Sequence, residues 1–117
     1  MKDIINISNM LKNLGISANL SGYYYIRDAV MLMLNDVLSI NKLTKIIYPC
    51  VAKTWCTTKA QVERGIRTAI EKAWIKGDVE FQNELFGFSV DPNKGRPTNS
   101  EFLATVADYI RTMEEIV

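Results

Sequence analysis

Apolar side chains recur at intervals of three and four residues along nearly the whole of this 117-residue chain. Because successive residues of an α-helix are rotated by about 100°, this spacing places the apolar side chains on one face of a helix. The apolar stretch at residues 23–38 is too long for a strand and predicts a central helix. A short alternation at residues 86–90 is compatible with a strand, but a lone strand has no partner. The pattern therefore predicts an all-α fold.

We expect about six helices in one compact domain, because no repeat, low-complexity segment or long linker divides the chain. Pro49 predicts either a kink or a new short helix at residues 48–55, and the stretch 87–98 is the one clear loop. Thr98 and Glu101 have the spacing of a capping box at the start of the last helix. The predicted helices lie at about residues 4–14, 23–38, 43–55, 58–75, 79–85 and from 98 onward.

The chain contains no histidine, which removes the commonest general base and the commonest metal ligand. If the stretch between them is helical, Cys50 and Cys56 fall on different faces, so neither a disulfide nor a two-cysteine metal site is favoured. The sequence shows no glycine-rich phosphate loop and no pair of carboxylates at a spacing suited to acid–base catalysis. We therefore expect a protein that is not an enzyme and that has no cofactor and no metal site.

No apolar run approaches the roughly 20 residues that a membrane span requires, because charged residues interrupt every candidate. The chain begins without the apolar segment of a secretory signal. We expect a cytoplasmic protein with reduced thiols and no membrane partner.

Residues 48–75 have the layout of a helix-turn-helix motif, in which a short helix and a tight turn precede a longer helix. Cys56 stands in the turn, where glycine is more usual. The spacing predicts that one face of the longer helix packs on the core. The apolar residues of that face are Val62, Ile66, Ala69, Ile70 and Ala73.

Arg64 points almost directly away from this apolar face and is flanked by Gln61 and Thr68. Glu63 lies at the border between the two faces. In a DNA major groove, Arg pairs with guanine, Gln pairs with adenine and Glu accepts from the amino group of cytosine. The competing interpretation is a solvated helix face on which Glu63 pairs with Arg67.

The net charge of +1 conceals an uneven distribution along the chain. Residues 53–76 carry six basic and two acidic side chains, a balance of +4, whereas residues 77–117 carry three basic and eight acidic ones, a balance of −5. Contacts to DNA phosphates require local rather than net positive charge. The distribution therefore favours DNA binding by the helix-turn-helix segment.

Three segments carry a further signal, and they read GYYYIRDAV, TTKAQVERGIRTAIEKAW and RPTNSEFLATVAD. In order and spacing, from about residue 7 to residue 111, they resemble the C-terminal effector domain of the sporulation response regulator family, stage-zero sporulation protein A. The resemblance implies that residues 1–117 form one all-helical DNA-binding effector domain of a transcription regulator. In the family this domain is joined to an N-terminal receiver domain, whose phosphorylation promotes dimerisation and DNA binding; the receiver is absent from this chain.

The resemblance also implies roles for individual residues. The segment VER places Glu63 and Arg64 at the family's base-reading positions. Gln61 and Thr68, where the family usually has Arg and His, face the same groove, and Gly65 replaces the family's Ala. We expect DNA backbone contacts from Arg67, Lys59, Thr58, Lys53, Lys94 and Arg96, with Thr98 and Asn99 as further candidates.

The partner that the resemblance implies is double-stranded DNA with a box similar to TGTCGAA, and Gln61 and Thr68 are expected to alter the preferred flanking bases. We also expect self-association on tandem sites and RNA polymerase as a further partner. The alternative is a helical protein-interaction module in which residues 53–76 dock an acidic partner without DNA. An excised domain and a free-standing homologue without a receiver remain equally compatible with the sequence.

Tyr23, Tyr24 and Tyr25 are compatible with a stacking platform for single-stranded nucleic acid. However, three consecutive helix residues spread over about 200° and do not share one face. We expect these tyrosines to pack in the core or on the surface of the protein, and Trp55 and Trp74 to lie in the core.

Overall fold

The computed structural model describes residues 2–35, 42–87 and 95–116, and every regular element within these residues is helical. The predicted all-α fold is therefore confirmed. The described residues form six α-helices and one π-helical turn. In chain order these elements are α1 (Lys2–Leu14), α2 (Ser21–Asn35), η2 (Leu43–Ile47), α3 (Tyr48–Thr54), α4 (Lys59–Lys76), α5 (Val79–Phe86) and α6 (Asn99–Ile116).

Local sequence explains most of the helix ends. Helix α1 ends just before Gly15, whose φ of 93° is a conformation that glycine adopts readily. Pro49 lies in the first turn of α3, a position that proline favours, so this proline accompanies the start of a new helix directly after the π-helical turn. Helix α2 begins at Ser21, two residues before the predicted start, and the predicted end at residue 38 lies outside the described residues.

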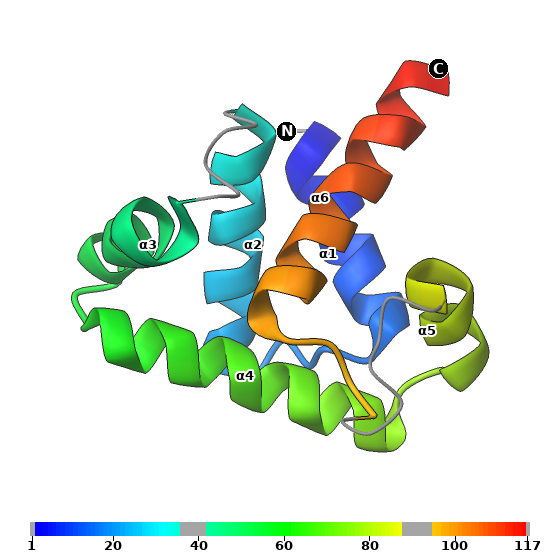
Figure 1. Cartoon of the computed structure of the whole chain (residues 1–117), viewed down its shortest axis with the longest axis horizontal. Helices are drawn as coiled ribbons and strands as arrows, with labels where there is room; N and C mark the ends of the chain where they lie inside the picture. Colours follow the sequence, from blue (N-terminus) through cyan, green and yellow to red (C-terminus); the bar gives the residue numbers. More distant parts are fainter. Residues whose placement is uncertain (1, 36–41, 88–94, 117) are drawn as a thin grey trace.

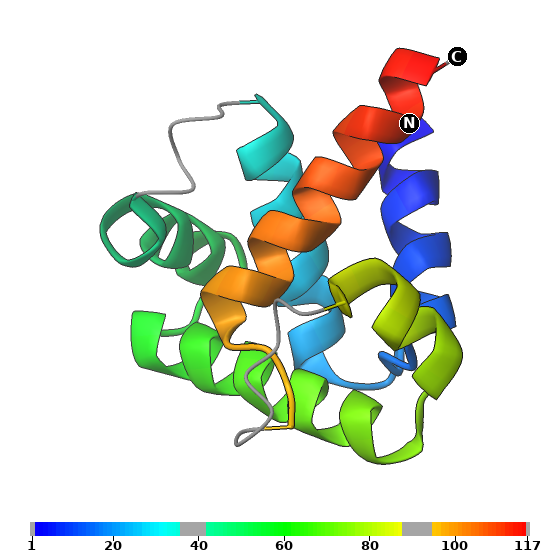
Figure 2. The same ribbon diagram turned by 45° about the vertical axis from the view of Figure 1, so that its right-hand side comes forward.

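Helix α2 is the central helix of the molecule, as the sequence predicted. It contacts α1, α3, α4 and α6, and Figure 1 shows α2 and α6 standing over α4, which runs along the lower side. Figure 2 shows α1 beside α6, with both ends of the chain at the same end of the molecule. The side chains that α2 buries are Ile26, Ala29, Val30 and Met33.

Helices α2 and α4 cross so closely that no side chain fits at Gly22. A Cβ atom on Gly22 would overlap the carbonyl oxygen of Gly65 and would lie 2.8 Å from the Cβ of Ala69. A Cβ atom on Gly65 would lie 2.9 Å from the ring of Tyr25. The crossing therefore holds the middle of α4 against the centre of the fold.

Helix α5 joins the ends of two other helices through one buried side chain. Gln82 is 3% exposed, and its amide donates hydrogen bonds to the carbonyl oxygen of Leu14 (3.0 Å) and to that of Ala73 (2.9 Å). Because Leu14 ends α1 and Ala73 lies in the last turn of α4, this amide ties the two helix ends together.

The two tryptophans differ in their environments. Trp74 was predicted to lie in the core; it is partly buried and packs on the core against Phe86 and Phe102, with ring centroids 5.2 and 6.0 Å away. The prediction that Trp55 lies in the core is wrong, because its side chain is 41% exposed. Trp55 directly follows α3 at the start of a tight surface turn, which leaves only part of the indole ring in contact with protein.

The buried part of the Trp55 side chain contacts α2. Its indole N–H donates to the carboxylate of Asp28 at 2.7 Å, and its ring lies 5.5 Å from Tyr24 and 6.5 Å from Tyr25. Tyr23, Tyr24 and Tyr25 are half-buried and pack against neighbouring side chains, as predicted. Within the described residues, no helix combines the length and the apolar character needed to cross a membrane.

Candidate nucleic-acid interface

Helices α3 and α4 form the predicted helix-turn-helix, and the turn between them depends on an unusual residue. Cys56 has a φ of 53°, a left-handed conformation that glycine adopts more readily than cysteine. The N–H of Trp55 donates to the carbonyl of Val51, and the N–H of Thr57 donates to that of Ala52. These two hydrogen bonds close the end of α3 and turn the chain sharply towards α4.

Thr58 is the N-cap of the longer helix. The Oγ1 atom of Thr58 accepts a hydrogen bond of 3.1 Å from the N–H of Gln61, and the Thr58 carbonyl accepts from Val62. Helix α4 therefore begins at Lys59, and it ends at Lys76, one residue beyond the predicted end.

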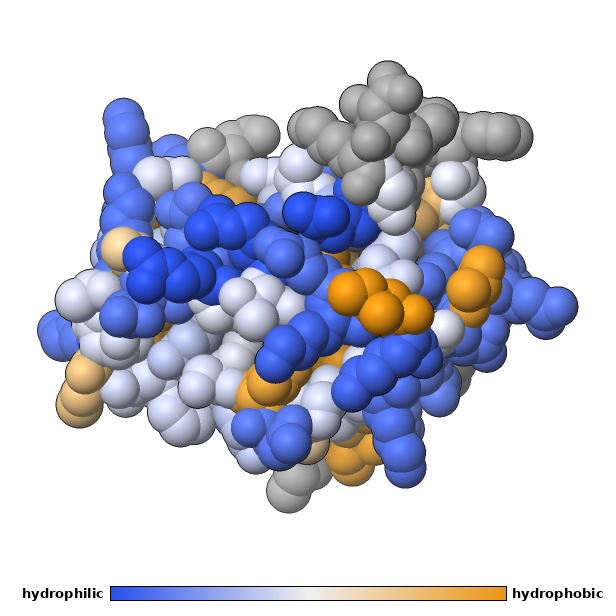
Figure 3. Space-filling view, turned by 90° about the horizontal axis from the view of Figure 1, so that it is seen from below, coloured by the Kyte–Doolittle hydropathy of each residue, from blue (hydrophilic) through white to orange (hydrophobic). Residues whose placement is uncertain are grey.

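The predicted division of α4 into two faces is present in the structure. Val62, Ile66, Ala69, Ile70 and Ala73 are all buried. Seen from below, the side of the molecule along which α4 runs is mostly hydrophilic (Figure 3). The side chains of α4 that the sequence assigned to DNA and that lie exposed are Lys59, Gln61, Arg64, Arg67 and Thr68.

Glu63 and Arg67 form the ion pair that the competing interpretation anticipated. The distance from Arg67 Nη1 to Glu63 Oε1 is 3.4 Å, and the two side chains are 50% and 45% exposed. Surface ion pairs of this kind contribute little free energy. Both side chains are therefore able to exchange this contact for a contact with a ligand.

Predicted backbone-contact residues also flank α4. Lys53 and Thr58 are exposed on either side of the turn. Arg96 is exposed on the loop before α6, and its Nη2 atom lies 3.8 Å from Glu71 Oε1 of α4. This ion pair brings the loop alongside α4, whereas Lys94 lies outside the described residues.

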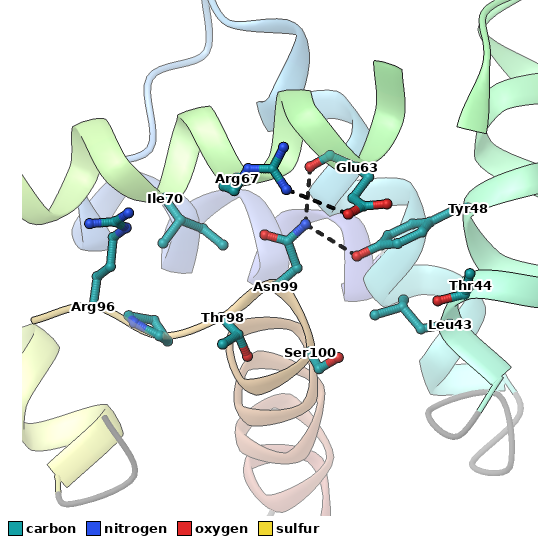
Figure 4. A pocket seen from close by; sticks show the side chains of 11 residues that line it. Leu43, Thr44, Tyr48, Glu63, Arg67, Ile70, Arg96, Thr98, Asn99 and Ser100 are labelled. Atoms are coloured by element: carbon teal, nitrogen blue, oxygen red, sulfur yellow. Dashed lines mark hydrogen bonds and ion pairs between the residues drawn. The ribbon is translucent and has the colours of Figure 1, made fainter. Parts of the chain in front are cut away.

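A cavity of about 620 Å³ lies between α4, the start of α3 and the start of α6. Figure 4 shows Arg67 on the α4 side of the cavity, Arg96 on the loop and Asn99 between α4 and α3. Each arginine is paired with a carboxylate of α4, Arg67 with Glu63 and Arg96 with Glu71. The charges around the cavity are therefore balanced, and its walls are held together by polar contacts.

Asn99 joins three helices inside this cavity. Its Nδ2 atom donates to the backbone carbonyl oxygen of Glu63 at 3.0 Å and to the hydroxyl oxygen of Tyr48 at 3.2 Å. Tyr48 is 3% exposed, and burial raises the pKa of its hydroxyl above the ordinary value, while the hydrogen bond from Asn99 opposes part of that rise.

Asn99 and Thr98, which the sequence placed among the candidates for DNA backbone contacts, both make hydrogen bonds within the protein. The N–H of Thr98 donates to Glu101 Oε1 at 2.8 Å, and the N–H of Glu101 donates to Thr98 Oγ1 at 3.2 Å, which is the predicted capping box. Tyr48 was not a candidate at all. In the sequence, Tyr48 stands out only by its position near the start of a short helix. That position does not indicate that its hydroxyl bonds to Asn99, 51 residues away.

Residues 7–110 match the family model described as "Sporulation initiation factor Spo0A C terminal". The match includes the turn, α4, the cavity and α6 as far as Ile110.

Proposed function

The chain belongs to the Spo0A C-terminal family, a family of DNA-binding effector domains, and we propose that it binds double-stranded DNA in a sequence-specific manner with α4 in the major groove. The observation that carries this proposal is the exposed polar face of α4, which lies opposite the face buried against the core. A recognition helix requires this combination, because one face must hold it rigidly while the other reads bases.

Two residues of α4 would read the central bases of the site. Arg64 is exposed and presents a planar guanidinium that can pair with the O6 and N7 atoms of guanine. Glu63, next to it, can accept from the amino group of cytosine once its contact with Arg67 is exchanged. Gln61 and Thr68 are exposed beside them and would select the flanking bases.

Basic and hydroxyl side chains around this surface would hold the phosphates. Lys53 and Thr58 lie at the turn, Lys59 and Arg67 on α4, and Arg96 on the loop. Phosphate contacts position the protein on the duplex and make binding depend on salt, but they carry no sequence information.

The target we propose is a box similar to TGTCGAA, with flanking preferences of its own because Gln61 and Thr68 replace the residues usual in the family. On tandem boxes we propose self-association, and in transcription a contact with RNA polymerase. These partners rest on membership of the family.

A fluorescence-anisotropy titration tests the central proposal. One labelled duplex carries the TGTCGAA box, a second carries the same bases in scrambled order, and both are titrated at two salt concentrations. We expect tighter binding to the box at both salt concentrations, and weaker binding to both duplexes at the higher one.

Equal affinity for the two duplexes at both salt concentrations would contradict sequence-specific binding. That result would favour the alternative, a helical module whose basic segment at residues 53–76 docks an acidic protein.

A further inference from the structure

Asn99 is the first residue of α6, yet its side chain bonds to both helices of the helix-turn-helix (Figure 4). The acceptor on α4 is the backbone carbonyl of Glu63, 36 residues away in sequence, and the acceptor on α3 is the Tyr48 hydroxyl, 51 residues away. One amide group therefore spans the contact between α3, α4 and α6.

The start of α6 is itself rigidly held. The capping box of Thr98 and Glu101 fixes the backbone on either side of Asn99. Phe102, one turn further along α6, is completely buried and stacks on Phe86. The amide of Asn99 is therefore a fixed point against which α4 is placed.

The hydrogen bond from Asn99 meets α4 at Glu63, beside Arg64, and this position is what makes the bond relevant to base recognition. The Glu63 carbonyl is in the same backbone unit that leads to Arg64, so its location determines where both proposed base-reading side chains begin. A rotation of α4 about its axis would move Arg64 on the exposed face and would shift the buried face by the same angle. The hydrogen bond from Asn99 opposes such a rotation at Glu63, one of the two proposed base-reading residues.

The Tyr48 hydroxyl gives this bond a second anchor. Because Tyr48 is almost completely buried in the start of α3, its hydroxyl cannot move far. Asn99 thus fixes α4 relative to α3 as well as relative to α6, with its side chain only partly buried.

We propose that Asn99 is a positioning residue that sets the orientation of α4, and thereby the base specificity of Glu63 and Arg64. This inference rests on the proposed DNA-binding function and assigns to Asn99 a role inside the protein rather than on the DNA backbone.

Asn99→Ala tests the inference through the ratio of affinities for the box duplex and the scrambled duplex. Loss of the bond to the Glu63 carbonyl is expected to lower this ratio about fivefold. Affinity for the scrambled duplex and the salt dependence of binding are expected to stay unchanged, because no phosphate contact is removed.

Two further variants separate positioning from general stability. Gln82→Leu removes two buried hydrogen bonds of α5 and leaves the capping box and both hydrogen bonds of Asn99 in place, so it is expected to lower the melting temperature while keeping the ratio. Asn99→Asp keeps the size of the side chain and places a negative charge at a helix N-terminus, which favours folding. Its carboxylate cannot donate to the Glu63 carbonyl, so the ratio is expected to fall as in Asn99→Ala.

An unchanged ratio in a folded Asn99 variant, with wild-type preference for the box intact, overturns the positioning role alone. An equal loss of the ratio in Gln82→Leu also overturns it, since the effect is then one of general stability. Absence of any preference in the wild-type protein overturns the proposed function together with this inference.

Discussion

Arg64 is the side chain on which the proposed base recognition depends most. It is exposed on α4 and lies opposite the buried face, so its replacement does not disturb the core. Arg64→Ala is expected to weaken binding to the box duplex by about 1–3 kcal/mol and to relax the preference among bases. Anisotropy titrations against box and scrambled duplexes measure both effects.

Lys72→Ala serves as the matched control for Arg64→Ala, because Lys72 is also an exposed basic residue of α4 but lies two turns further on. If Arg64→Ala kept the wild-type ratio of the two affinities, or if Lys72→Ala reduced it as much, Arg64 would not be the base-reading residue.

Lys59 has a different expected role, as a phosphate contact at the first residue of α4. Lys59→Ala is expected to weaken all duplexes alike and to reduce the slope of log affinity against log salt by about 0.9. Titrations at four or more salt concentrations give this slope. A loss confined to the box duplex would show instead that Lys59 reads bases.

Trp55 illustrates a residue whose environment the sequence did not reveal. Trp55→Phe keeps an aromatic ring beside Tyr24 but removes the indole N–H that donates to Asp28. The free energy of unfolding is expected to fall by about 1 kcal/mol, a modest value because the site is partly exposed. Urea denaturation measures this change.

A double-mutant cycle with Asp28→Ala shows whether the hydrogen bond is responsible for the loss at Trp55. The losses in free energy of unfolding of the two single variants are expected to sum to more than the loss in the double variant, because each single change removes the same hydrogen bond. Strict additivity would mean that the bond contributes nothing to stability.

At the scale of elements, the amphipathic pattern predicted α4 well because a helix period assigns each side chain to a face without reference to any other helix. The pattern did not predict how closely α2 and α4 approach. That distance depends on Gly22, which meets the backbone of α4, and on Gly65, which meets a side chain of α2.

Gly22→Ala and Gly65→Ala are therefore expected to differ. The new methyl group at Gly22 collides with the backbone of Gly65, which cannot yield without separating the helices, so a loss of about 3 kcal/mol is expected. At Gly65 the neighbour is the Tyr25 side chain, which can shift, and alanine improves helix propensity by about 1 kcal/mol. Gly65→Ala is expected to stay within about 1 kcal/mol of the wild type.

Thermal and urea denaturation of the two glycine variants give the comparison directly. A Gly65→Ala variant as unstable as Gly22→Ala would show that Tyr25 is held too firmly to move.

At the scale of the whole molecule, Gln82 connects elements that are distant in sequence. Gln82→Leu removes the amide that donates to the Leu14 carbonyl, 68 residues away. It also removes one of two donors to the Ala73 carbonyl, which keeps its hydrogen bond from the N–H of Gly77. Since the site is buried, the free energy of unfolding is expected to fall by about 2–3 kcal/mol. Glu84→Ala, an exposed position on the same helix, is the control and is expected to change it by less than about 0.5 kcal/mol.

The expected loss in Gln82→Leu depends on the burial of the two carbonyls. If calorimetry gave equal stabilities for Gln82→Leu and Glu84→Ala, water would be donating to the Leu14 and Ala73 carbonyls in place of the Gln82 amide.

Charge also acts at the scale of the whole molecule. The +4 of residues 53–76 lies on and beside α4, where the exposed face is polar, whereas the acidic balance belongs to the segment that includes α5 and α6. The net charge of +1 is therefore no guide to the partner, because phosphates respond to the charge near them.

The sequence by itself determined the features that depend on neighbours within a few residues. The helical class, the buried face of α4, the cap at Thr98 and the location of positive charge all follow from helix period, side-chain-to-backbone bonds over three residues and composition. Only the tertiary structure decided the features that join distant segments. The exposure of Trp55, the crossing at Gly22 and the bonds of Gln82 and Asn99 depend on how the helices pack, which a local period does not encode.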